Sequence, residues 1–162
     1  MKNILTLKEA ISISKKLKER QKTIALTGGC FDIIHTGHIK FLEKSKKYAD
    51  SLFVLLENDK SAAKLKGENR PINNQRNRAI VLSSLKPVDY VVLLPDILSN
   101  SDYDGLVEKI NPQYLCATKN DPNIVHKKRQ AKKINAKVIF STNKIVDQST
   151  SRIAKIIENL NL

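Results

Sequence analysis

A short segment joins an apolar stretch to an amphipathic one through glycines and histidines. The apolar residues 23–26 predict a buried strand, the glycine pair 28–29 ends it, and a helix pattern begins at Gly37. His35 and His38 therefore stand where a strand gives way to a helix. The first amides of a helix lack partners within it and carry the positive end of its dipole. Two imidazoles at such a place predict a site for a phosphate chain.

Strands and helices alternate along the predicted chain, with prolines between them. The predicted strands are Thr23–Leu26, Ser51–Leu56, Tyr90–Leu93, Gln113–Ala117 and Lys137–Phe140. The predicted helices are Thr6–Arg20, Gly37–Tyr48, Asn74–Leu85, Asp102–Ile110, Pro122–Ile134 and Ser149–Asn159. This alternation predicts an α/β fold, a Rossmann-like doubly wound five-stranded parallel sheet with helices on both faces. Ligands of such sheets bind beyond the carboxyl ends of the strands, where the histidine segment falls.

The length of 162 residues suits one domain over 1–162, in which residues 1–20 form a leading helix. No apolar run approaches the roughly 20 residues of a membrane helix, so we expect no membrane partner. The cysteines Cys30 and Cys116 lie far apart and form no metal pattern. Their small number and the absence of a signal-like leader favour a cytoplasmic protein.

The net charge is +13, which allows anionic small molecules, nucleic acid or a lysine-rich surface as explanations. Aromatic residues make up 5% of the chain and tryptophan is absent, which argues against a stacking platform for single strands. The basic run 126–133 is interpreted as a solvated helix face, and His126 has no suitably spaced second metal ligand. We therefore expect phosphorylated small molecules as partners and no nucleic acid.

The histidine segment also fits a longer pattern, Gly-x-Phe-Asp-x-x-His-x-Gly-His. Its fixed positions are Gly29, Phe31, Asp32, His35, Gly37 and His38. In these residues the chain resembles the cytidylyltransferase-like nucleotidyltransferases. Residues 65–71, 77–85, 88–89 and 148–151, with the leader 7–10, are similar to the adenylyltransferase domain of ADP-heptose synthesis.

This resemblance implies transfer of AMP from ATP to a sugar 1-phosphate, preferably D-glycero-D-manno-heptose 1-phosphate. Pyrophosphate leaves, and Mg²⁺ accompanies ATP without dedicated protein ligands. A CTP-dependent glycerol-phosphate-type cytidylyltransferase and an FMN adenylyltransferase remain alternatives within the enzyme class. A catalytically degenerate nucleotide- or RNA-binding protein is the alternative of another class. A homodimer remains open.

The resemblance also assigns roles to individual residues. The catalytic residues it implies are His35, His38, Lys66 and Arg78. The nucleotide-binding residues are Gly29, Cys30, Phe31, Asp32, His35, Gly37, His38, Lys119, Ser149, Thr150 and Ser151. The residues implied to bind the acceptor phosphate are Lys66, Arg70, Arg78 and Lys144. A phosphate nucleophile is already ionised, so such a site needs positioning and positive charge rather than a general base.

Some of these residues have a second interpretation. Cys30 is expected to be a small buried residue rather than a nucleophile, and Phe31 to pack beneath the loop. Asp32 either holds the turn or contacts the ligand. Residues 118–121 depart from the resembled enzymes, which carry a Gly-Asp turn there. Lys119 is expected to take over part of that turn's role, and the base and acceptor stay open.

Overall fold

A computed structural model describes residues 3–67, 69–96 and 99–142 of the chain. Its centre is a parallel sheet of six strands in the order β1-β4-β3-β2-β5-β6. The strands are β1 (Ile4–Leu5), β2 (Ile24–Gly29), β3 (Ser51–Leu56), β4 (Tyr90–Leu93), β5 (Tyr114–Thr118) and β6 (Lys137–Thr142). The predicted Rossmann-like parallel sheet is confirmed, but it has one more strand than expected. The extra strand, β1, spans two residues, too few to show a pattern.

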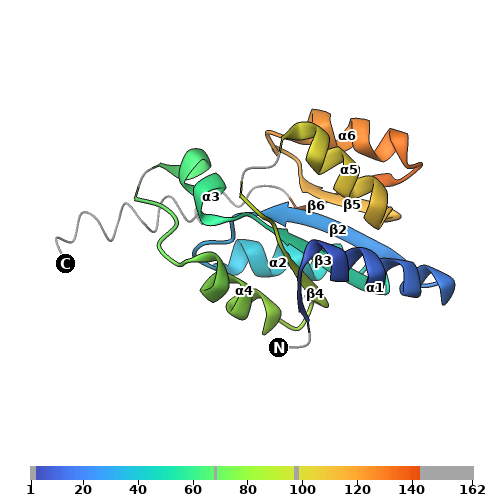
Figure 1. Ribbon diagram of the computed structural model, residues 1–162, viewed down its shortest axis with the longest axis horizontal. Coiled ribbons are helices and arrows are strands. Elements are labelled where there is room, and N and C mark those ends of the chain that lie inside the picture. The colour runs from blue at the N-terminus through green and yellow to red at the C-terminus, as the bar shows by residue number, and fades with distance from the viewer. Residues whose placement is uncertain (1–2, 68, 97–98, 143–162) are drawn as a thin grey trace.

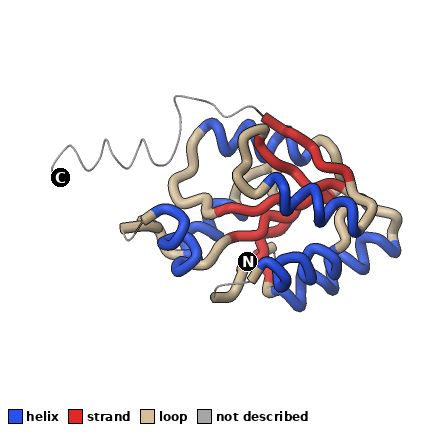
Figure 2. Tube along the Cα trace, turned by 90° about the horizontal axis from the view of Figure 1, so that it is seen from above, coloured by secondary structure: helices blue, strands red, loops and turns tan. Residues whose placement is uncertain are grey.

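Helices cover both faces of this sheet (Figures 1 and 2). They are α1 (Leu7–Glu19), α2 (Thr36–Lys46), α3 (Asp59–Lys66), α4 (Gln75–Ser83), α5 (Asn100–Ile110) and α6 (Ile124–Lys133). One apolar core joins α1, α5 and α6 to the sheet, and includes Leu26 and Val107. A second core joins α2 and α4 to the opposite face, and includes Ala25 and Leu42. The alternation of Ala25 and Leu26 follows from the two-residue period of a strand.

Two predicted segments differ from the structure. No element was predicted between Leu56 and Asn74, yet α3 lies there. Asn58 caps this helix, because its side chain accepts from the Ser61 amide at 2.8 Å, and Gly67 ends it with φ of +109°. The predicted helix Ser149–Asn159 lies outside the described residues. Within the described ranges, no helix is both long and apolar enough to cross a membrane.

The strand order reverses direction at β2, which lies between β3 and β5. β2 pairs with β3 along its whole length, up to Gly29 opposite Leu56. With β5 it pairs only through Ala25 and Leu26. The two strands thus separate toward their carboxyl ends, and the histidine segment follows β2 directly. A ligand site is expected at this switch in strand order.

Candidate active site

Two stacked histidines mark the start of α2. Their ring centroids lie 3.9 Å apart, with 24° between the planes. His35 caps the helix: its Nδ1 accepts from the Gly37 amide at 3.1 Å, and its carbonyl accepts from the His38 amide at 2.9 Å. Because Nδ1 of His35 accepts, its neutral ring carries the proton on Nε2. His35 thus satisfies two amides that were expected to bind phosphate, and the imidazoles become the donors at this turn.

Burial makes both imidazoles weaker bases than a free histidine. Burial lowers the pKa of His38 to about 4, and the nearby charges of His35 and Lys66 add to this effect. Burial also lowers the pKa of His35. The neutral His35 ring offers its Nε2–H group, whereas the His38 ring is hydrogen-bonded to the Ile33 backbone, and its Nδ1 is buried without a hydrogen-bond partner among the described residues. A bound triphosphate would raise both pKa values through its negative charge, and a protonated His38 can donate from both ring nitrogens.

Lys66 is the last residue of α3 and is exposed. Its charge acts on His38 and also on the Cys30 thiol. The structure thus brings Lys66 to the histidine segment, although 28 residues of sequence separate it from His38. A flexible ammonium group here can approach a phosphate held by the imidazoles.

Asp32 is buried, and both of its carboxylate oxygens accept hydrogen bonds from within the protein. Its carboxylate accepts from Arg70 Nε at 2.6 Å and from the amides of Ile72 and Asn73 at 3.0 Å each. Burial alone would raise the pKa of Asp32, but the amides of Asn73 and Ile72 and the Arg70 guanidinium together hold it below its usual value. The side chains of Arg70 and Asp32 are 7% and 2% exposed. These contacts favour the role of holding the turn over ligand contact, and they place Arg70 in the same role.

Arg78 is 1% exposed, and its guanidinium joins several loops. It donates to the carbonyls of Asn73 at 2.9 Å and Glu57 at 2.8 Å, and also to that of Cys30. It forms an ion pair with Asp59 at 2.6 Å. The three planar donor nitrogens are thus occupied. The geometry supports Arg78 as a positioning residue that holds the ends of β2 and β3 together.

The turn residues before His35 pack rather than react. Cys30 is buried, and burial raises the pKa of its thiol. Phe31 is 7% exposed, and its ring lies 5.1 Å from that of His38. A Cβ on Gly29 would come within 3.1 Å of the Phe31 ring, so glycine allows this close approach. The close packing of Phe31 against Gly29 thus places the Phe31 ring beside that of His38.

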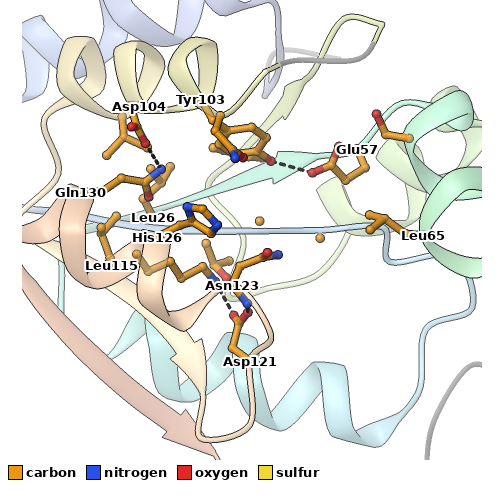
Figure 3. A pocket seen from close by; sticks show the side chains of 18 of the residues that line it. Leu26, Glu57, Leu65, Tyr103, Asp104, Leu115, Asp121, Asn123, His126 and Gln130 are labelled. Atoms are coloured by element: carbon orange, nitrogen blue, oxygen red, sulfur yellow. Dashed lines mark hydrogen bonds and ion pairs between the residues drawn. The ribbon is translucent and has the colours of Figure 1, made fainter.

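A cavity of about 390 Å³ opens on the other face of the sheet, above β2 and β5 (Figure 3). Its apolar lining includes Leu26, Leu55 and Leu115 from the sheet and Val107 from α5. Its polar lining includes Glu57, Ser61, Lys64, Asn100, Tyr103, Asp104, Asp121, Asn123, His126, Lys127 and Gln130. The cavity also touches residues 27–29, so it begins at the same end of β2 as the histidine segment.

Several lining residues were not predicted as functional. Tyr103 donates to Glu57 Oε1 at 2.7 Å, and Gln130 donates to Asp104 at 2.8 Å. Nδ1 of His126 is buried, and among the described residues it has no hydrogen-bond partner. Glu57 follows β3 directly, so its place at the carboxyl edge was the one available signal. The other lining residues named here lie on α5 and α6, and the sequence did not show which faces of these helices point into the cavity.

The remaining predicted residues are not brought together by the described structure. Lys119 is exposed in the turn after β5 and does not line the cavity. Lys144 and the residues 149–151 lie outside the described part of the chain. In residues 3–67, 69–96 and 99–142, no group of three or more His, Cys, Asp or Glu could hold a metal ion.

Comparisons with known proteins identify the family of the chain. A family model described as cytidylyltransferase-like matches residues 26–160. The bifunctional protein HldE of Aliarcobacter butzleri is 45% identical over 113 residues, which cover 70% of this chain and 23% of that protein. HldE of Nitratiruptor sp. is 46% identical over 103 residues, 64% of this chain and 21% of that protein. The match thus spans less than a quarter of the length of these two relatives.

Solved structures show the same architecture. A lipopolysaccharide core biosynthesis protein from Thermoplasma volcanium has a TM-score of 0.59 and 25% identity, covering 75% of this chain and 95% of that one. A pantoate-beta-alanine ligase from Francisella tularensis has a TM-score of 0.68 and 18% identity, covering 99% of this chain and 79% of that one. The second likeness concerns the fold alone.

Proposed function

Because the chain belongs to the cytidylyltransferase-like family, we propose that it transfers AMP from ATP to a sugar 1-phosphate and releases pyrophosphate. Membership of this family makes the chain a nucleotidyltransferase. The choice of ATP and of a heptose 1-phosphate is supported by the segments 65–71, 77–85 and 88–89, which are similar to the ADP-heptose-forming domain. The identity to HldE supports the same choice.

The observation that carries the proposal is the stacked pair His35 and His38 at the switch in strand order. In the transfer, an oxygen of the acceptor phosphate bonds to the α-phosphorus of ATP, and the bond from that phosphorus to the pyrophosphate oxygen breaks. The Nε2–H group of His35 and the His38 ring, protonated beside the bound triphosphate, donate to phosphate oxygens as charge accumulates on the leaving group. Lys66 adds positive charge from α3.

We propose that Mg²⁺ binds to the phosphates of ATP. This ion usually keeps several water ligands and takes few ligands from a protein. When bound it neutralises part of the triphosphate charge. The chain's own task is then to align the two substrates. The Asp32 and Arg78 contacts serve this alignment, because they hold the loop around the histidines in one position.

A panel assay of pyrophosphate release tests the proposal. ATP and CTP are each combined with heptose 1-phosphate, glycerol 3-phosphate and FMN, in the presence of Mg²⁺. We expect release with ATP and heptose 1-phosphate, and none from the same pair with the His35→Ala, His38→Ala double variant. A preference for CTP with glycerol 3-phosphate, or for ATP with FMN, would establish an alternative acceptor class. No release from any pair would contradict the proposal.

A further inference from the structure

The cavity holds a carboxylate that the proposed chemistry does not use. Glu57 lies directly after β3, and its backbone is fixed on both sides: its amide donates to the Gly29 carbonyl at 3.1 Å, and its carbonyl accepts from Arg78 at 2.8 Å. Its side chain lines the cavity beside α3 (Figure 3). A carboxylate mounted on so constrained a backbone has a defined position before any ligand arrives.

Tyr103 orients this carboxylate from the opposite wall. Its hydroxyl donates to Oε1 of Glu57 at 2.7 Å (Figure 3). Burial, followed by the charge of Glu57, raises the pKa of Tyr103, so the phenol stays protonated and remains a donor. Among the described residues no donor reaches Oε2 of Glu57. One oxygen is thus held while the other remains available to accept hydrogen bonds.

The charges around Glu57 indicate which part of a ligand it meets. A carboxylate repels phosphate but accepts hydrogen bonds from hydroxyl groups. Lys64 lines the same cavity, and Lys66 ends the same helix. Both lysines lie on α3, the helix that follows Glu57. Because residues two apart on a helix point to different sides, Lys64 is the one of the two that shares the cavity with Glu57. A ligand that places its phosphate at Lys64 and its hydroxyls at Glu57 satisfies both charges.

Accordingly, we propose that Glu57, oriented by Tyr103, selects a polyhydroxylated acceptor by accepting hydrogen bonds from its hydroxyl groups. This inference rests on the proposed function for the identity of the acceptor. Tyr103 is a positioning residue, and Glu57 touches the substrate. The ribose of the nucleotide is the other source of hydroxyl groups, and the comparison of ATP with 2′-deoxy-ATP distinguishes the two sources.

Binding without turnover tests the proposal. Heptose 1-phosphate and ethyl phosphate carry the same phosphate, but ethyl phosphate lacks hydroxyls. Calorimetric titrations of the parent chain should show about 10- to 100-fold tighter binding of heptose 1-phosphate, the range for hydrogen bonds to a charged group. In Glu57→Gln this preference should fall to less than about threefold, with Tyr103→Phe between the two. Removing the negative charge of Glu57 raises the affinity for both phosphates alike, so the ratio of the two dissociation constants is unaffected by it.

The matched control is Glu43→Gln, an exposed position on α2, which should keep the full preference. The proposal is overturned if Glu57→Gln keeps that preference, or if the parent shows none. It is also overturned if Glu57→Gln instead abolishes discrimination between ATP and 2′-deoxy-ATP, since the carboxylate then meets the ribose. Failure of the proposed function gives a different result. In that case the binding preference persists and depends on Glu57, but the assay detects no release of pyrophosphate.

Discussion

On the α2 side of the sheet, the polar groups near the histidines bond to one another, except for Nδ1 of His38, which is buried without a hydrogen-bond partner among the described residues. Asp32 is bonded to Arg70 and two amides, and Arg78 to three carbonyls and Asp59. On the α5 and α6 side, polar groups line an open cavity, where Nδ1 of His126 has no partner among the described residues. The first region resembles a rigid support, and the second a surface kept ready for a ligand.

This difference suggests a division of labour along one sheet edge. Phosphoryl chemistry is the same for every acceptor, so the groups that serve it can be fixed by internal hydrogen bonds. Selection among acceptors requires donors and acceptors that remain available until the substrate binds. The two regions meet at residues 27–29, where β2 ends.

The largest expected effect concerns the rigidity of the first region. Asp32→Ala leaves the Arg70 guanidinium buried without its partner, and should lower the free energy of unfolding by about 3–5 kcal/mol. Urea denaturation measures this loss. The control is Asp96→Ala, which breaks the exposed ion pair with Lys60 and should cost less than about 1 kcal/mol. Similar small losses in both variants would show that the first region is not held by Asp32.

The next prediction compares one histidine in each region by their effects on kcat and KM. His38→Ala should lower kcat by about 10²–10³, because it removes a donor to charge that develops during transfer. His126→Ala, in the cavity, should instead raise the KM of a substrate and leave kcat within about threefold. Steady-state kinetics of both variants, with circular dichroism to check the fold, distinguish these outcomes. A fall in kcat for His126→Ala that matches that of His38→Ala would remove the proposed division.

A pH titration tests the burial of the histidine pair. Folded His38 has a pKa of about 4 against 6.5 for an unperturbed histidine, so between these values the unfolded chain binds a proton that the folded chain does not. The free energy of unfolding should therefore fall as the pH drops through this window, by on the order of 3 kcal/mol from His38. His38→Gln should lose less stability over the same range. Equal pH slopes for parent and variant would place the imidazole in open solvent.

The smallest expected effect concerns the ammonium group of Lys66 at the end of α3. Lys66→Ala should lower kcat/KM by about 10- to 100-fold, the range for a charge-assisted hydrogen bond. Lys44→Ala, an exposed lysine in the last turn of α2, should leave kcat/KM unchanged. If the two variants behave alike, Lys66 contributes only to the general positive field.

Much of the fold was readable from the sequence, because its signals are local. The strands Ser51–Leu56 and Tyr90–Leu93 were predicted with their observed bounds, since turn residues flank short apolar runs. β1 was missed because two residues carry no period. α3 was missed because its sequence is polar, and its start depends on the Asn58 cap rather than on an apolar face.

The site was predicted less completely, because it depends on contacts distant in sequence. The position of the histidines followed from one glycine-rich segment. The burial of Arg70 and Arg78 did not, since it arises from Asp32 and from carbonyls of other loops. The pairing of Tyr103 with Glu57 spans 46 residues and joins two walls of the cavity. No local pattern encodes such a pair.

The most direct test of the central claim is the identity of the products. Phosphorus NMR of the chain with ATP, Mg²⁺ and heptose 1-phosphate follows every phosphorus atom through the reaction. The account predicts equal amounts of pyrophosphate and of a new sugar-linked diphosphate, with loss of the heptose 1-phosphate signal. Formation of ADP and a sugar bisphosphate, or an unchanged mixture, would contradict nucleotidyl transfer to this acceptor.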